Sequence, residues 1–140
     1  MNKFTLFNAL LLMLVLPLFA FGQARTVKVI AIEFTGKVNG TDAAKIARCE
    51  KFKPTLQQTK TFFNRADYIP KATMPAEGEA PCYASGILLY SDGSKATWTL
   101  YANGFASLWL MRGEEISLRY ENNTWCNPLS NVACSKTTTE

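Results

Sequence analysis

Residues 81–111, PCYASGILLYSDGSKATWTLYANGFASLWLM, decide the fold of this 140-residue chain. Apolar and polar side chains alternate along the stretch with the period of two that is typical of β-strands. Two short glycine-containing segments, SDGS and ANG, interrupt the alternation in the manner of hairpin turns, and RGEE precedes a fourth alternating run. The pattern predicts an antiparallel meander with strands over residues 82–90, 95–101, 105–111 and 116–121.

The residues before the meander predict a further strand and a short helix. Residues 27–34, VKVIAIEF, are rich in β-branched side chains, as strands are. Their alternation slips just after Val29, which indicates either a bulge or burial of both faces. Residues 43–52 then predict a short helix with Thr41 or Asp42 as its N-cap, and the proline that follows ends it.

A second helix has a sharper signal. Thr55-Leu56-Gln57-Gln58 matches a capping box, in which the Thr hydroxyl and the Gln amide satisfy backbone amides at the helix start. Apolar residues then recur at helical spacing, so we predict an amphipathic helix over residues 56–65. Residues 67–81 contain three prolines and a glycine and predict an ordered connector between helix and meander.

Together these segments predict a protein of the α+β class. We expect an antiparallel β-meander of four to five strands, with one or two helices packed on one face and disulfides that cross-link the fold. The strands over residues 82–90 and 105–111 are apolar on both faces, so helical material should cover part of their second side. We expect Trp98, Phe105 and Trp109 to lie in the core.

The start of the chain predicts its compartment. Lys3 precedes an almost wholly apolar run over residues 6–21, and small residues follow, which is the order of a secretory signal peptide. We assign residues 1–22 to it, with cleavage after Gly22 or Ala24, and residues 23–140 to one globular domain. The apolar run is short for a membrane span, so we expect an exported chain, periplasmic or secreted, without stable membrane insertion after cleavage.

Four cysteines follow the predicted cleavage site. An even number of cysteines in a small exported protein indicates disulfides, and four allow three pairings. We favour Cys126–Cys134, because the NPLSN segment between them has the composition of a turn, and this leaves Cys49–Cys82 as the second bridge. A zinc site of four thiolates is the competing explanation, and the absence of any C-x-x-C pair argues against it.

The sequence carries little of the chemistry that enzymes use. It contains no histidine, which removes the usual general base, the usual zinc ligand and any nucleophile–histidine pair. Nucleotide- and phosphate-binding motifs are missing too, so we expect no catalytic residue, no cofactor and no metal. A hydrolase with paired carboxylates stays open as a third hypothesis. The acid pairs that it would need, Glu77 with Glu79 and Glu114 with Glu115, are more simply explained as solvated charges.

Basic residues gather in one part of the chain. Residues 45–71 contain seven Lys and Arg residues but two acids. The cluster is either a solvated helix face or a docking patch for a protein partner with an acidic surface. A nucleic acid is not the expected partner of an exported protein with so modest a charge. Three aromatic residues beside turns or on strand faces of mixed polarity are added to four of these basic residues. The candidate partner-binding residues are Lys51, Lys53, Lys60, Arg65, Tyr83, Tyr101 and Trp125.

The meander resembles, at a distance, the signature of periplasmic C-type lysozyme inhibitors, Ser-Gly-x-x-Tyr followed by Lys-Gly-x-x-Ala-x-Leu. Ser85-Gly86 is followed by Tyr90 with one residue too many. Asn103-Gly104 replaces Lys-Gly, and one residue is missing before the Ala-x-Leu. Because a one-residue shift in a strand moves a side chain to the opposite face, the inhibitor's binding residues do not carry over.

A second resemblance covers more of the chain. Its motifs are Cys49-x-x-Phe52-x-Pro54-Thr55, Phe62-Phe63-x-x-Ala66 and Pro81-Cys82-Tyr83-Ala84-x-Gly86, with Trp98 in the following strand. These motifs resemble small exported bacterial disulfide proteins of the periplasmic immunity or inhibitor type. The resemblance implies an inhibitory role and brings no catalytic residues.

The leading hypothesis is therefore a soluble periplasmic binding protein, not an enzyme, that acts as an inhibitor or immunity protein against a cell-envelope-targeting enzyme or toxin. The alternative is a small-molecule-binding or envelope-structural module, in which the second face of the sheet would line a pocket.

Overall fold

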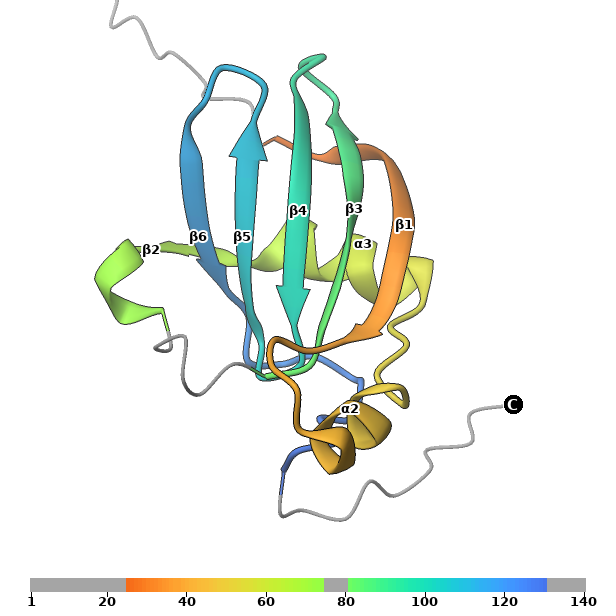
Figure 1. The fold of residues 1–140 in the computed structure, drawn as a ribbon. Coiled ribbons are helices and arrows are strands. Elements are labelled where there is room, and N and C mark those ends of the chain that lie inside the picture. The colour runs from red at the N-terminus through yellow and green to blue at the C-terminus, as the bar shows by residue number, and fades with distance from the viewer. Residues whose placement is uncertain (1–24, 75–80, 131–140) are drawn as a thin grey trace, which may run out of the picture.

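The computed structural model describes residues 25–74 and 81–130 (Figure 1). The predicted signal peptide with both of its cleavage sites, the acids Glu77 and Glu79, and Cys134 lie outside the described residues. Among the described residues no helix is long and apolar enough to cross a membrane. The elements follow in the order β1 (Val27–Lys37), α2 (Ala43–Cys49), α3 (Leu56–Arg65), β2 (Asp67–Ile69), the 3-10 helix η1 (Lys71–Thr73), β3 (Tyr83–Tyr90), β4 (Lys95–Tyr101), β5 (Phe105–Leu110) and β6 (Glu115–Arg119).

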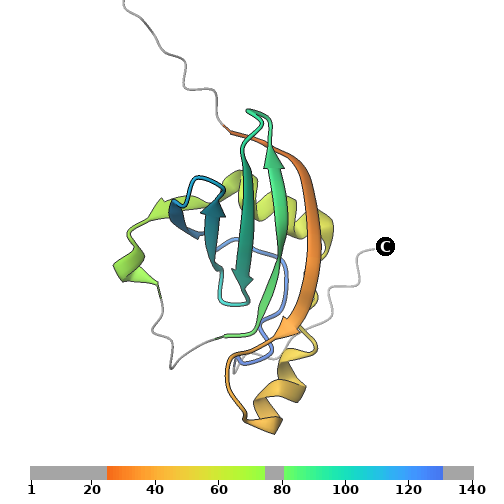
Figure 2. The same ribbon diagram turned by 45° about the horizontal axis from the view of Figure 1, so that its top comes forward.

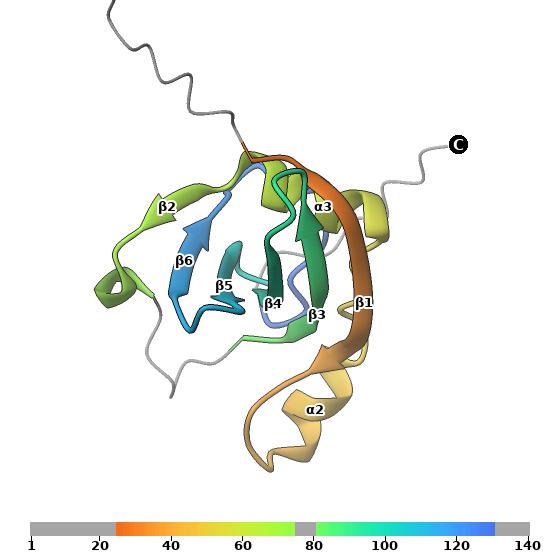
Figure 3. The same ribbon diagram turned by 90° about the horizontal axis from the view of Figure 1, so that it is seen from above.

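The strands form one antiparallel sheet in the order β1-β3-β4-β5-β6-β2. The predicted α+β class, the meander and its hairpins are confirmed. The sheet has six strands where four to five were expected, because Asp67–Ile69, in the predicted connector, pairs with β6. Seen from above, the sheet curves around α3, which lies on its concave side (Figure 3).

The inner face of the sheet, which we define as the face toward α3, forms the core. Register places Ala84, Gly86 and Leu88 of β3 on this face, level with Leu100, Trp98 and Ala96 of β4. The helix contributes Phe62 and Phe63, and the Phe63 ring centroid lies 5.4 Å from that of Trp98. The fully or nearly fully buried side chains of this core include Phe52, Phe62, Phe63, Ala84, Leu88, Ala96, Trp98, Leu100, Ala106, Leu108, Leu110 and Leu118.

Gly86 makes this packing possible. A Cβ atom at this position would lie 2.0 Å from the Ala31 carbonyl oxygen of β1 and 2.8 Å from the Trp98 ring. No side chain fits in that space, so the glycine lets β1 and the indole both approach the β3 backbone. Trp98, the largest fully buried side chain, therefore packs directly against Gly86.

Of the two alternatives for β1, the bulge is confirmed. The register shifts between Val27 and Val29, close to the predicted slip, and again between Ile32 and Phe34. Each shift adds a residue to β1 relative to β3 and bends the strand. The strand can therefore follow the curvature of the sheet around α3 (Figure 3).

The short helix α2 lies beyond the lower end of β1 (Figure 2). Asp42, one of the two predicted candidates, is its N-cap and accepts hydrogen bonds from the backbone amides of Ala44 and Lys45. The helix ends at Cys49, earlier than expected. It ends there because Cys49 is held in a disulfide and the chain then turns inward to bury Phe52.

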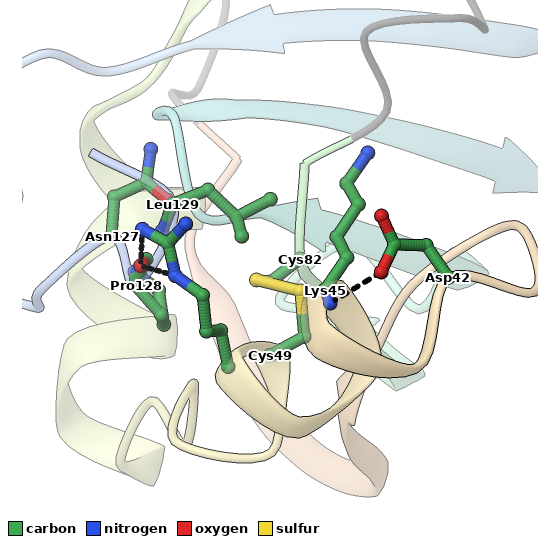
Figure 4. Close-up of a disulfide and its surroundings, with 8 residues drawn as sticks. Asp42, Lys45, Cys49, Cys82, Asn127, Pro128 and Leu129 are labelled. Atoms are coloured by element: carbon green, nitrogen blue, oxygen red, sulfur yellow. Dashed lines mark hydrogen bonds between the residues drawn. A yellow bond between two sulfur atoms is a disulfide. The ribbon is translucent and has the colours of Figure 1, made fainter. Parts of the chain in front are cut away.

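The Cys49–Cys82 disulfide ties α2 to the start of β3, as predicted (Figure 4). Both cysteines are fully buried, and their Cα atoms are 5.1 Å apart. Cys126 is also disulfide-bonded, and its predicted partner Cys134 lies outside the part of the chain that the structure describes. Near the bridge, the Arg48 guanidinium donates to the Pro128 carbonyl at 2.7 Å and draws the segment after β6 toward α2.

The capping box of α3 is confirmed, as are the predicted helix bounds. The Thr55 hydroxyl accepts from the Gln58 amide at 3.1 Å, and the Gln58 side-chain oxygen accepts from the Thr55 amide at 2.8 Å. Both amides belong to the helix start, where no intrahelical carbonyl can serve them.

We expect Thr55→Ala to lower the free energy of unfolding by about 1 kcal/mol, because the Gln58 amide then loses its acceptor. Urea denaturation followed by circular dichroism measures the loss. Lys60→Ala, at an exposed position inside the same helix, is the matched control and should change stability by less than about 0.5 kcal/mol. Equal losses in the two variants would mean that the cap contributes nothing.

Candidate binding face on the sheet

The outer face of the sheet is the one turned away from α3, and it faces the viewer in Figure 1. Residues on β3, β4, β5 and β6 that pair across the strands share one face, so the register assigns each side chain. Among the described elements, no α-helix covers this face, and the short helix η1 lies at its margin beside the edge strand β2. The predicted helical cover is thus present on one face of the sheet only.

Small hydroxyl side chains form a line across the middle of the outer face. Ser85, Thr99, Ser107 and Ser117 stand level on β3, β4, β5 and β6. Ser107 and Ser117 are buried although they lie on the open face, because larger side chains stand on both sides of them. Ser117 Oγ has no hydrogen-bond partner among the described residues. We call these four residues the hydroxyl row.

A row of aromatic rings borders the hydroxyl row on one side. Tyr83, Tyr101 and Phe105 lie on adjacent strands, between Lys37 of β1 and Arg119 of β6. The rings of Tyr83 and Tyr101 meet edge to face with centroids 6.2 Å apart. The Arg119 guanidinium carbon lies 5.3 Å from the Phe105 ring centroid, within cation–π range. We call Tyr83, Tyr101 and Phe105 the aromatic row.

Exposed apolar residues border the hydroxyl row on the other side and at its β1 end. Trp109 and Ile87 are 49% and 48% exposed and flank Thr97 in the same register line. On β1, Val29 is 55% exposed and Phe34 is 56% exposed, level with Leu89 and Ser85 respectively. Four of the large exposed hydrophobic residues thus converge on the outer face.

The structure corrects the prediction for Trp109. The sequence pattern placed Trp109 in the core with Trp98, but the two lie on opposite faces, since Trp98 stands level with Leu108 and Trp109 with Thr97. Phe105, also expected in the core, is half-buried on the outer face beside Arg119. Trp98 is 1% exposed, as expected. Strand β5 is apolar on both sides, and the helix covers the side that carries Ala106, Leu108 and Leu110.

Trp125 was expected to be exposed, but the structure shows it partly buried. The indole packs against the core, with its ring centroid 6.0 Å from Phe52 and 5.8 Å from Phe62. Its Nε1–H donates to the Ala102 carbonyl at 3.0 Å. The apolar ring closes the lower end of the core, and the one polar atom finds its partner in the β4–β5 turn.

The remaining predicted binding residues fall into two groups. Tyr83 and Tyr101 lie together on the outer face. Lys60 and Arg65 are exposed on α3, behind the sheet in Figure 1, and Lys51 and Lys53 are exposed in the segment between α2 and α3. We call Lys51, Lys60 and Arg65 the helix-side basic residues. Lys53 differs from them because it lines a hollow at the end of β1.

Charge is unevenly distributed over the outer face. At the β6 side, Lys71 pairs with Glu115 and lies 6.0 Å from the Trp109 ring, and Arg119 pairs with Glu121. These cations are balanced by acids, including Asp67 opposite Arg119. Lys37 of β1 and Lys95 of β4 are exposed and form no ion pair with the described residues. The unneutralised positive charge of the face therefore lies toward β1 and β4.

Two titratable groups near the β3–β4 turn have structural roles. Burial raises the pKa of Tyr90 to about 12, so its hydroxyl stays neutral at physiological pH. Hydrogen bonds from the Ser94 side chain and amide hold the pKa of Asp92 below its usual value. Asp92 also pairs with Arg25 at 2.9 Å, and Asp92-Gly93 forms the predicted hairpin turn. The described residues contain no cluster of three His, Cys, Asp or Glu side chains that could hold a metal.

The outer face was not identified from the sequence, although a signal for it exists. The inner positions of the meander include Ala84, Gly86, Ala96 and Ala106, which are small enough for a helix to pack closely. The opposite positions carry Tyr83, Tyr101, Phe105 and Trp109, so the face of the meander without these small residues is the open one. The chain matches no protein-family model, and no curated protein or solved structure is detectably similar to it.

Proposed function

We propose that this chain is an exported binding protein, an inhibitor or immunity protein that acts against a cell-envelope-targeting enzyme or toxin through the outer face of its sheet. One observation carries the proposal: Val29, Phe34, Ile87 and Trp109, all about half exposed, lie on the same open face. Soluble proteins rarely leave a contiguous apolar surface uncovered unless it binds something.

The composition of the face favours a protein partner. Trp, Tyr and Arg are the residues that contribute most to protein–protein interfaces, and Trp109, Tyr83, Tyr101 and Arg119 lie on this one face. The polar hydroxyl row between apolar side chains offers hydrogen-bonding groups inside such an interface. A small-molecule site, by contrast, is a concave pocket that encloses its ligand.

The inhibitory role rests on further features of the chain. The predicted export, the disulfide and the resemblance to periplasmic immunity proteins all suit a small stable protein of the cell envelope. The sequence offers no histidine for catalysis. A protein of this kind acts by covering part of another enzyme, which requires only a complementary surface.

The proposal is tested by capture followed by inhibition. The purified mature chain is immobilised, an envelope fraction of the producing bacterium and a set of toxins encoded beside the gene are passed over it, and each retained enzyme is assayed with added chain. We expect at least one retained enzyme to lose its activity at a one-to-one ratio. Retained enzymes that keep full activity in excess chain would contradict the inhibitory role.

Ile87→Ala and Leu56→Ala form a matched pair for the same assay. Both remove a branched aliphatic side chain of similar exposure, but Ile87 lies on the outer face and Leu56 on α3. We expect Ile87→Ala to weaken inhibition and Leu56→Ala to leave it unchanged. Equal effects of the two variants would show that the outer face is not the inhibitory surface.

A further inference from the structure

The aromatic row ends beside a hollow that carries positive charge. The hollow lies between the end of β1 and α2 and is lined by Thr35, Gly36, Lys37, Val38, Ile46, Glu50 and Lys53. Lys37 connects the two features, because it lines the hollow and pairs in register with Tyr83 of the aromatic row. The hollow is therefore a continuation of the aromatic row past the edge of the sheet.

The hollow contains two lysines and one acid. Neither Lys37 nor Lys53 forms an ion pair with the described residues, and Glu50 is the one acid among the lining residues. Ile46 and Val38 supply apolar surface beside them, and Ile46 is one of the large exposed hydrophobic residues. A carboxylate placed between the two ammonium groups would gain charge-assisted hydrogen bonds in partly apolar surroundings.

The dimensions suit a short extended segment. Phe105, Tyr101, Tyr83 and Lys37 lie on four adjacent strands, and neighbouring strands are about 4.8 Å apart, so the line from Phe105 to Lys37 is about 14 Å long. An extended polypeptide advances about 3.3 Å per residue, so about five residues reach from Phe105 to the hollow.

We propose that the outer face binds an extended segment of the partner protein that crosses the strands along the aromatic row and places an Asp or Glu side chain between Lys37 and Lys53. The apolar or aromatic residues of the segment lie over Phe105, Tyr101 and Tyr83, and the carboxylate fixes the direction in which the segment runs. This inference rests on the proposed function, and it adds the chemistry and orientation of the partner segment.

The charge distribution of the face selects one direction. The acids Glu115, Asp67 and Glu121 neutralise the cations at the β6 side, whereas Lys37 and Lys53 stay unneutralised at the β1 side. A segment with its acid toward β6 would meet like charge, and one with its acid toward β1 meets two cations. If the segment had no acidic residue, its apolar residues would bind in either direction.

The test is a selection of random twelve-residue peptides displayed on phage against the mature chain, followed by synthesis of the enriched peptides. We expect the enriched sequences to carry an apolar or aromatic run with Asp or Glu at one end. Replacing that acid by its amide should weaken binding by at least about fivefold, and so should the double variant Lys37→Glu/Lys53→Glu. The control double variant Lys60→Glu/Arg65→Glu makes the same charge change on α3 and should alter binding less than about twofold.

Four other outcomes would contradict the inference. Enriched peptides whose binding requires Tyr101 and Ile87, but which contain no acidic residue, would overturn the inference and leave the proposed binding face intact. Peptides more sensitive to Lys60→Glu/Arg65→Glu than to Lys37→Glu/Lys53→Glu would overturn both. Failure to enrich any peptide for the outer face, or self-association of the chain through that face in sedimentation, would also contradict a partner segment as the occupant. Near-ultraviolet circular dichroism of each variant verifies that it is folded.

Discussion

We expect Trp98→Ala to lower the free energy of unfolding by about 3–5 kcal/mol, the largest loss of any single substitution considered for this chain. Trp98 is the largest fully buried side chain, and its ring lies between Gly86 of the neighbouring strand and Phe63 of α3. Glycine has no side chain that could move into the space of the lost indole, so the cavity would stay largely open. Urea denaturation measures the loss.

Two further variants show what the Trp98 result means. Trp109→Ala removes the same side chain from the outer face and should cost less than about 1 kcal/mol, because half of that ring is already exposed. Trp98→Phe keeps an aromatic ring and removes a buried indole N–H that has no partner among the described residues, so it should cost much less than Trp98→Ala. If Trp98→Ala and Trp109→Ala cost the same, the assignment of inner and outer faces is wrong.

The second large effect concerns the disulfide between Cys49 and Cys82. The bridge closes a loop with a sequence separation of 33, and in the chain-entropy model a loop of this length contributes about 4 kcal/mol. We therefore expect the double variant Cys49→Ala/Cys82→Ala to lose about 2–5 kcal/mol, measured by thermal and urea unfolding. A loss below about 1 kcal/mol would mean that α2 and the start of β3 stay together without the bridge.

The parts of the fold that the sequence predicts best are those with a strong local signal. The bounds of α3 follow from the Thr55–Gln58 capping box and from the helical spacing of its apolar residues, and the structure shows the same bounds. The meander follows from alternation and glycine-containing turns. Strand β2 was missed because three residues beside a proline have no measurable period, and only pairing with β6 makes them a strand.

The candidate site was predicted less well, because faces and neighbours are set by tertiary packing. Alternation divides β5 into two apolar sides but does not say which one meets α3, so Trp109 was assigned to the wrong side. Trp125 follows the last strand without any pattern, and its burial depends on Phe52, Phe62 and the Ala102 carbonyl, which are distant in sequence. The pairing of Tyr83 with Tyr101 depends on hairpin register, which a turn of defined length fixes.

The central claim is that the outer face of the sheet, and not the helix-side basic residues, binds the partner. Surface plasmon resonance tests it most directly, with the captured enzyme immobilised and two variants of the chain compared with the wild type. The variant Ile87→Ala/Trp109→Ala loses two exposed apolar side chains of the outer face, and Lys51→Glu/Lys60→Glu/Arg65→Glu reverses the helix-side charges. We expect the first variant to dissociate at least about tenfold faster and the second to dissociate at the wild-type rate. An unchanged dissociation rate for the first variant, together with faster dissociation of the second, would contradict the claim and place the binding site on the helices.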